Sequence, residues 1–286
     1  MIKDYYSIVK PGIIYGNALT LVAGFMLASQ GSVKVGLLLL TLIGLSCVIG
    51  SGCVFNNYID RDIDALMERT KGRVMVKGSL SPSYALVYGT VLGVVGFCIL
   101  VLFTNRVTVI VSMIGFFVYV GIYSMWLKRS STHSSIIGSI SGAVPPVIGY
   151  LAVTGSFDRG ALLLFFILAL WQMPHSLAIA IYRLRDYQAA SIPVLPVRKG
   201  IYRTKVQILV YTILFVIFTG LLYVYGYAGK LYLFIMIVLG TLWVLFALKG
   251  FFISADEDKL WARSVFLFSL IILTVFSGLL ILGIGR

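Results

Sequence analysis

The sequence predicts an all-α membrane protein with nine transmembrane helices. Of its 286 residues, 60% are hydrophobic and only 12% are charged, whereas soluble domains carry about 45–50% apolar and roughly 25% charged residues. The mean hydropathy is +1.02. The apolar residues also come in runs of about 20, which is the length of helix that crosses a hydrocarbon core about 30 Å thick.

Each apolar run is expected to be a helix, because a backbone in lipid must satisfy its own hydrogen bonds. The 29 glycines allow close helix approach. Pro145 and Pro146 in the fifth run and Pro174 in the sixth predict bends or broken turns. In chain order the runs lie near residues 12–30, 35–55, 83–104, 107–126, 136–154, 160–181, 206–227, 231–250 and 264–284.

The charges between the runs predict the topology. If the N-terminus is cytoplasmic, 18 of the 23 Lys and Arg residues fall in cytoplasmic segments. The positive-inside rule therefore predicts a cytoplasmic N-terminus and a C-terminus outside. The net charge of +13 does not indicate a nucleic-acid partner, because the basic residues are not gathered into one patch. The five basic residues on the outer side would be Lys34, Arg106, Arg159, Lys230 and Arg286.

Residues 1–286 are expected to form a single domain with a coarse internal repeat. One loop with both acidic and basic residues follows the second run, and another, Tyr182 to Gly200, follows the sixth. Both loops would face the cytoplasm, four runs apart. This layout favours a four-plus-four arrangement of residues 12–126 and 136–250 with a ninth helix added.

The first loop, NNYIDRDIDALMERTKGRVMVKG, is the most charged stretch of the sequence. On a helix Asn56, Asp60 and Asp64 would share one face, while Asp62 would point nearly opposite. Two carboxylates four residues apart repel each other unless a cation lies between them, and Mg²⁺ accepts one or two carboxylates plus phosphate and water. The basic residues that follow could neutralise a substrate diphosphate; they are Arg69, Arg73 and Lys77.

The alternative for this loop is a solvated segment whose charges pair with one another and with lipid headgroups. The second loop favours the functional interpretation, because it also combines an acid, Asp186, with the arginines Arg183 and Arg185. Two facing loops could hold metal and diphosphate between them. A simple salt bridge between Asp186 and Arg183 remains open as the alternative.

These residues resemble a known family. The pattern Asn56-x-x-x-Asp60-x-x-x-Asp64 followed by ERTKGRVMVKG is similar to the first aspartate-rich motif of the UbiA-type intramembrane prenyltransferases. Three more stretches resemble the branch of that family that farnesylates protohaem, and the resemblance covers nearly the whole chain. These stretches are VKPGIIYGN (9–17), SISGAVPPVIGYLAVTG (139–155) and LWQMPHSLAIAIYRLRDYQAASIPVLPV (170–197).

The resemblance implies a nine-helix bundle around a central cavity that opens to the cytoplasm. It implies transfer of a farnesyl group from farnesyl diphosphate to a vinyl group of protohaem IX, giving haem O and diphosphate for terminal oxidases. By resemblance, Asn56, Asp60 and Asp64 would hold Mg²⁺ on the diphosphate, and Asp186 would serve a second metal position. The candidate phosphate partners are Lys10, Arg69, Arg73, Lys77, Lys128, Arg129 and Arg183.

One departure from the wider family bears on the acceptor. Position 190 is Ala, so Asp186 lacks the partner of a second D-x-x-x-D motif. This disfavours an aromatic, quinone-precursor acceptor and leaves the second metal open. The expected setting is the bacterial cytoplasmic (inner) membrane, with the lipid bilayer and haem-handling or oxidase-assembly proteins as partners.

The two histidines are weighed separately. His175 is next to Pro174 inside the sixth run, where ionisable residues tend to be functional, so it could ligate haem iron or orient the substrate. A buried histidine bonded to a neighbouring helix is the alternative. His133, in the polar segment KRSSTHSSI, is expected to be a solvated loop residue, with a haem contact as the alternative.

Two non-enzymatic classes compete with the enzyme. A secondary transporter would suit helices bent at proline, but the charges gather at one membrane face rather than at the midplane. A haem carrier or assembly protein would use the two loops only for docking. It would tolerate loss of Asp60, which an enzyme of this kind would not.

Overall fold

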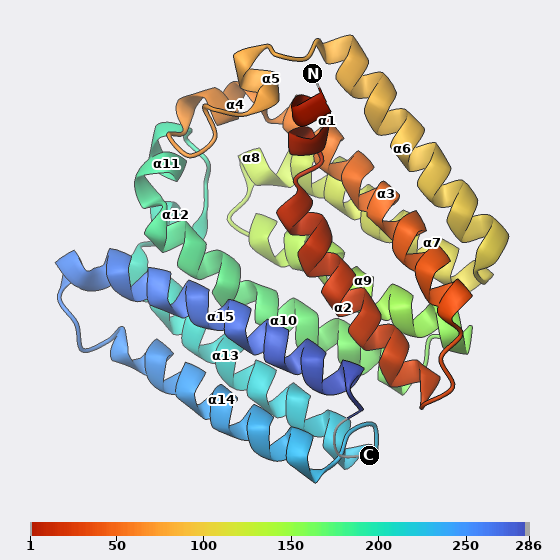
Figure 1. Cartoon of the computed structure of the whole chain (residues 1–286). Coiled ribbons are helices and arrows are strands. Elements are labelled where there is room, and N and C mark those ends of the chain that lie inside the picture. The colour runs from red at the N-terminus through yellow and green to blue at the C-terminus, as the bar shows by residue number, and fades with distance from the viewer. Residues whose placement is uncertain (1, 284–286) are drawn as a thin grey trace.

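The computed structural model describes residues 2–283, and its elements are helices (Figure 1). Within that range nine helical segments are long and apolar enough to cross a membrane, as the sequence predicts. The chain is therefore an integral, multi-pass membrane protein. The segments are α2 (Pro11–Ser29), α3 (Val35–Ile59), α6 (Pro82–Phe103), Arg106–Ser130, α9 (Ser134–Thr154), α10 (Arg159–Tyr182), α13 (Ile201–Val224), α14 (Lys230–Lys249) and Ala255–Ile281.

Two of the nine segments are composite. Arg106–Ser130 consists of α7 (Arg106–Phe117), the π-helix η1 (Val118–Leu127) and one turn, α8 (Lys128–Ser130). The last consists of the 3₁₀ turn η2 (Ala255–Glu257) and α15 (Asp258–Ile281). Residue 284, the end of the ninth predicted run, and Arg286 lie outside the described residues.

Several helices begin or end beyond the apolar runs. The second run, predicted at 35–55, continues as α3 to Ile59, and the seventh, predicted at 206–227, begins with α13 at Ile201. The additional residues include Asn56, Asn57, Arg203 and Lys205. Polar residues can extend a helix past the hydrocarbon core, so hydropathy alone underestimates its length.

The prolines do not break their helices. Pro145 and Pro146 lie inside α9, and Pro174 lies inside α10, and both helices continue through them. Of the predicted bends or broken turns, the broken turns were therefore wrong, and the bends stay a prediction. Neighbouring helices and local adjustments can compensate the missing N–H groups of proline within a membrane bundle.

Close packing of α2 against α9 depends on glycine. A Cβ atom added at Gly24 would lie 1.9 Å from the carbonyl oxygen of Pro146, and one added at Gly149 would lie 2.0 Å from that of Leu21. Any larger side chain would separate the two backbones. Small residues at such crossings are typical of membrane bundles, where helix association depends on van der Waals packing.

Five short helices lie at one end of the bundle, along the top and upper left of Figure 1, while α15 ends at the opposite end. Ile63 and Met67 of the first loop pack with Ala190, Ile192 and Val194 of the second. The two charged loops therefore meet, as the sequence predicts. The short helices are α1 (Ile2–Ile8), α4 (Arg61–Leu66), α5 (Val74–Lys77), α11 (Leu184–Ala189) and α12 (Leu195–Lys199).

Candidate active site

Two aspartates of the first loop point into the protein and one points out. Asp60 joins α3 to α4, and the backbone N–H groups of Asp60 and Asp64 donate to the carbonyls four residues earlier, at 2.9 and 2.8 Å. The four-residue spacing therefore survives the junction. Asp60 is 0% and Asp64 1% exposed, whereas the Asp62 side chain is 61% exposed. The predicted faces of this loop are confirmed.

Asp60 is the centre of a buried polar chain. Its Oδ2 accepts from Asn56 Nδ2 at 2.8 Å and from Lys128 Nζ at 2.5 Å. Asn56 Oδ1 accepts from Lys10 Nζ at 2.5 Å, and Asn56 Nδ2 also donates to Ser124 Oγ at 3.0 Å. The residue before α2, the end of α3 and the fourth membrane segment are thus joined in one hydrogen-bonded chain around Asp60.

Asp64 has a separate cation. The guanidinium of Arg73 pairs with Asp64 Oδ2, and Thr70 Oγ1 donates to the Asp64 carbonyl at 2.9 Å. These contacts connect α4 with the segment that leads to α5, and they hold the Asp64 carboxylate in place. Arg73 and Lys128 are therefore the two predicted basic residues that pair with the buried aspartates.

The unpaired carboxylate oxygens show whether these residues suit a metal. Oδ1 of Asp60 and Oδ1 of Asp64 are both buried and accept no hydrogen bond. Buried carboxylate oxygens without a donor are costly unless a cation is supplied. Mg²⁺ uses one or two carboxylates together with substrate phosphates. The two aspartates fit that requirement.

Asp186 is near the first loop but does not join the aspartate pair. Its Oδ1 accepts a hydrogen bond from the backbone N–H of Glu68 at 3.1 Å, which ties the two loops together. Within residues 2–283, no three His, Cys, Asp or Glu side chains are close enough to hold one ion. A metal at Asp60 and Asp64 would therefore need oxygen ligands from the substrate.

The other basic candidates form no ion pair with the buried Asp60 and Asp64 among the described residues. Arg69 and Lys77 are exposed on the first loop. The Arg183 guanidinium lies 4.6 Å from the centre of the Tyr182 ring. Arg129 donates to both carboxylate oxygens of Asp62 at 2.6 Å and to the Ile59 carbonyl at 2.7 Å. The hydrogen bonds from Arg129 lower the pKa of Asp62 to about 2. The guanidinium of Arg129 is therefore already bound to the first loop.

Lys10 has an unusual position for an ammonium group. It precedes α2 with φ 53° and ψ 69°, a left-handed conformation that non-glycine residues rarely adopt. Burial, followed by repulsion from Arg73, lowers the pKa of Lys10 to about 8. Strained backbone and a perturbed pKa tend to gather at functional sites.

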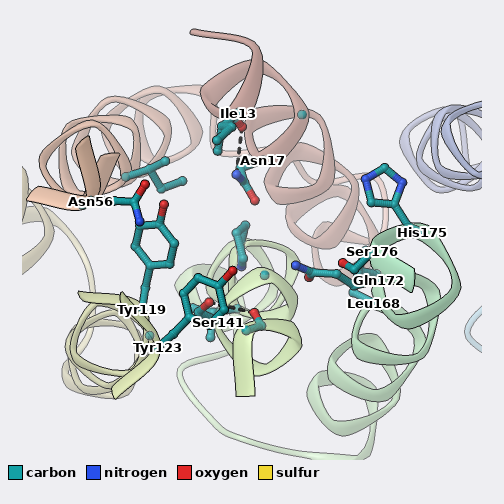
Figure 2. Close-up of a pocket in the computed structure, with 18 of the residues that line it drawn as sticks. Ile13, Asn17, Asn56, Tyr119, Tyr123, Ser141, Leu168, Gln172, His175 and Ser176 are labelled. Carbon is teal, nitrogen blue, oxygen red and sulfur yellow. Dashed lines mark hydrogen bonds between the residues drawn. The ribbon is translucent and has the colours of Figure 1, made fainter. Parts of the chain in front are cut away.

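A cavity of about 530 Å³ extends from this polar group into the bundle (Figure 2). Asn56 and Lys128 line one end, and Trp171, Gln172 and His175 line another part of the wall. Figure 2 shows Asn56 and His175 on opposite sides, with Tyr119 and Tyr123 beside Asn56. The volume lies within the range of roughly 300–1,000 Å³ typical of small-molecule sites.

The wall of this cavity contains residues that sequence reasoning missed. Tyr119 and Tyr123 stack with ring centres 6.1 Å apart and an angle of 12° between their planes, and both line the cavity from η1. π-Helices often occur at functional sites, and here ten residues adopt one. The four-residue spacing of the two tyrosines before Lys128 could have indicated from sequence that both lie on one helix face. Gln172 and Ser176 gave no signal beyond being polar within an apolar run.

The two histidines have different environments. His175 lines the cavity, and its Nδ1 lies 2.7 Å from Ser269 Oγ. His133 is exposed immediately before α9, with Nδ1 3.5 Å from Ser131 Oγ. The expectation of a solvated His133 is thus confirmed.

Comparison with known proteins identifies the family. The sequence profile of the UbiA prenyltransferase family matches residues 17–280. A protein named protoheme IX farnesyltransferase from Sodalis glossinidius (strain morsitans) is 54% identical over 271 residues, covering 95% of this chain and 91% of its own length. One of the same name from Serratia proteamaculans (strain 568) is 53% identical over 277 residues, with 97% and 93% covered.

Solved structures show the same fold at low sequence identity. A structure described with the biosynthesis of digeranylgeranylglyceryl phosphate synthase in membranes has a TM-score of 0.81 at 18% identity, covering 99% of this chain and 98% of its own. A UbiA homologue from Archaeoglobus fulgidus bound to DMAPP and Mg²⁺ has a TM-score of 0.66 at 16% identity, with 97% and 99% covered. From its sequence profile, its relatives and its fold, this chain belongs to the UbiA prenyltransferase family.

Proposed function

We propose that this prenyltransferase moves a farnesyl group from farnesyl diphosphate to a vinyl group of protohaem IX, releasing diphosphate and forming haem O. The names of relatives 52–54% identical to this chain support the two substrates. The observation in the molecule that carries the proposal is the pair of buried aspartates with unpaired oxygens beside a largely apolar cavity.

The diphosphate would occupy the polar end of the cavity. Asn56, Asp60 and Asp64 would hold Mg²⁺, which when bound supplies positive charge to the diphosphate oxygens. Lys10, Lys128 and Arg73 already lie around these groups, so they can contact phosphate oxygens once substrate binds. Their positive charge stabilises the electron pair that the departing diphosphate takes from the allylic C–O bond.

The isoprenoid and the acceptor would occupy the less polar part of the cavity. The allylic cation left by diphosphate departure must meet the vinyl π electrons before it meets water, and a largely apolar cavity inside the bundle limits the access of water. The vinyl carbon forms the new C–C bond, which moves the positive charge to the haem side. Water then adds there and loses a proton, leaving the hydroxyl group.

The membrane setting follows from the same geometry. The active site would open towards the cytoplasm in a bacterial inner membrane, because the segments on the same predicted side as the aspartate-bearing loops hold 18 of the 23 Lys and Arg residues. A transporter or a passive haem carrier would not require buried paired aspartates with free oxygens. Prenyl transfer to an aromatic acceptor would use the same diphosphate end, so the product must be identified directly.

The test compares two aspartates of the same loop. Purified protein in detergent is supplied with protohaem, farnesyl diphosphate and Mg²⁺, and the haem products are separated and weighed by mass spectrometry. We expect wild type to form a farnesylated, hydroxylated haem. The rate of product formation by Asp64→Asn should be roughly 10²–10³-fold lower. Chelation of the metal should stop product formation.

Asp62→Asn is the matched control, because it removes the same charge from an outward-facing position. Its ion pair with Arg129 is partly exposed, and such pairs contribute about 0–1 kcal/mol, so its rate should fall by less than about fivefold. Intact farnesyl diphosphate after incubation with folded, haem-bound wild type would contradict the proposal.

A further inference from the structure

His175 is held in the cavity wall by three side chains. Its ring stacks on Trp171, with ring centres 4.7 Å apart and 27° between the planes, and lies 5.0 Å from the ring of Phe266. Its Nδ1 lies 2.7 Å from Ser269 Oγ, and Trp171 Nε1 donates to the Ser269 carbonyl at 2.8 Å. Residues of α10 and α15 thus fix both the position and the plane of the imidazole.

The hydrogen bonds of Ser269 decide which nitrogen carries the proton. Ser269 Oγ lies 2.5 Å from the Phe266 carbonyl, which can only accept, so the hydroxyl gives its single proton to that carbonyl. The same oxygen must therefore accept from His175 Nδ1. In a neutral imidazole, the form that an apolar interior favours, Nε2 then carries a lone pair.

That lone pair faces the cavity. Nε2 of His175 has no hydrogen-bond partner among the described residues. It is not one of their fully buried polar atoms, so part of its surface is accessible from the interior space. The ring lines the same cavity as Asn56 and Lys128. Figure 2 places it on the opposite side from Asn56, the residue next to the buried aspartates.

We propose that Nε2 of His175 is an axial ligand of the protohaem iron. The inference rests on the proposed function, which makes protohaem the acceptor. Imidazole is a common axial ligand of haem iron, and a metal-binding histidine almost always donates its other N–H to a nearby acceptor that orients the ring. Ser269 is that acceptor here, and it is a positioning residue.

Ligation would fix the acceptor without taking part in bond formation. Farnesyl transfer occurs at a vinyl group on the edge of the porphyrin, while the iron is at its centre. A ligand on the wall opposite Asn56 would leave that edge to extend across the cavity towards the diphosphate end. The iron keeps its charge and the porphyrin its ring bonds, so this step only positions the substrate.

The composition of the chain makes the proposal easy to test. It contains two histidines, His133 and His175, and only His175 lines the cavity. An imidazole signature in the haem spectrum can therefore be assigned with one substitution and one control. The protein must be purified through a tag without histidine, because a polyhistidine tag would itself bind haem.

The experiment titrates ferric and ferrous protohaem into detergent-purified wild type, His175→Ala, His133→Ala and Ser269→Ala, and records absorption and electron paramagnetic resonance spectra. Wild type and His133→Ala should show an imidazole-ligated haem. His175→Ala should lose that signature, bind haem about 10–100-fold more weakly, and regain the signature with added imidazole. Ser269→Ala should keep a ligated haem with roughly tenfold weaker binding.

Iron-free protoporphyrin IX gives a second readout. Wild type should bind protohaem more tightly than the iron-free ring, and His175→Ala should bind both alike. A wild-type spectrum without imidazole ligation, or one unchanged in folded His175→Ala, would overturn the proposal. If haem O still forms in that case, the proposed function stands alone. If His175 ligates haem but no farnesylated product forms, the ligand assignment stands and the proposed function fails.

Discussion

Lys10 shows how one residue can make this site sensitive to pH. It contacts Asn56 from the start of α2, and burial together with Arg73 lowers its pKa to about 8. Below that pH the ammonium is charged and can attract a diphosphate; above it the group becomes neutral. Arg73 and Lys128 each form an ion pair with a buried aspartate. Lys10 instead donates to the uncharged amide of Asn56, so its charge is not neutralised by that contact.

The pH profile of activity checks this role. We expect kcat/KM for farnesyl diphosphate to fall as pH rises through about 8, by up to about tenfold per unit, because kcat/KM follows the ionisation of the free enzyme. Lys10→Arg should flatten the profile, since arginine stays charged.

Lys34→Arg is the matched control for that substitution, because Lys34 is exposed just before α3, in a segment predicted to lie outside. It should keep the wild-type profile. An identical fall in activity in Lys10→Arg would exclude Lys10 as the titrating group.

At the scale of the elements, α13 and α15 are linked by a third buried ion pair, away from the cavity. Lys205 Nζ lies 2.5 Å from Asp258 Oδ1, with the side chains only 10% and 8% exposed. The ammonium also lies 5.4 Å from the centre of the Trp261 ring. Removing one member of such a pair leaves an uncompensated charge in a buried place, which typically costs about 3–5 kcal/mol.

Stability measurements can separate this pair from ordinary packing. We expect Asp258→Leu and Lys205→Met each to lower the thermal midpoint of the detergent-purified protein markedly. The double variant Lys205→Met with Asp258→Leu should recover most of the loss, because neither charge is then left unpaired. A double variant whose loss equals the sum of the two single losses would contradict the coupling.

The repeat of four helices plus four, residues 12–126 and 136–250, stays a prediction at this scale. The two loops that suggested it do meet, through Ile63 and Met67 on one side and Ile192 on the other. They differ, however, in what they bring to the site. The first carries the buried aspartates, and the second carries Asp186 and the cavity residue Tyr187.

For the whole molecule, the orientation in the membrane is the remaining prediction. The short helices and the buried aspartates lie at one end of the bundle, and the positive-inside rule assigns that end to the cytoplasm. The substrate would then enter from the cytoplasmic side. Nine membrane-crossing segments in residues 2–283 put the end of α15 on the other side.

Cysteine labelling in intact cells tests this orientation. Ser79 and Ser156 are both exposed and lie in connections at opposite ends of membrane segments. We expect a membrane-impermeant thiol reagent to label Ser156→Cys and to leave Ser79→Cys unlabelled until the cells are opened. The unaltered protein, with its own three cysteines, sets the background. The reverse pattern would place the site outside the cytoplasm.

Much of this protein was predictable from sequence because the signals are local. Apolar runs of about 20 residues identify the spans, since the bilayer imposes their length. Asn56, Asp60 and Asp64 could be placed on one face because the helical repeat places residues four apart together. Hydropathy could not show that α3 continues to Ile59, because its last turn contains polar residues.

The fold class, the family and the shared helix face of Asn56, Asp60 and Asp64 follow from the residues alone, because each depends on local pattern. Which cation meets which carboxylate depends instead on helix packing: Lys128 pairs with Asp60, while the adjacent Arg129 turns outward to Asp62. The packing of the helices also gives Asp186 its hydrogen bond to the first loop and brings Ser269 Oγ to 2.7 Å from His175 Nδ1. These are contacts between residues up to 118 positions apart, and their geometry depends on how the helices pack, which local periodicity does not encode.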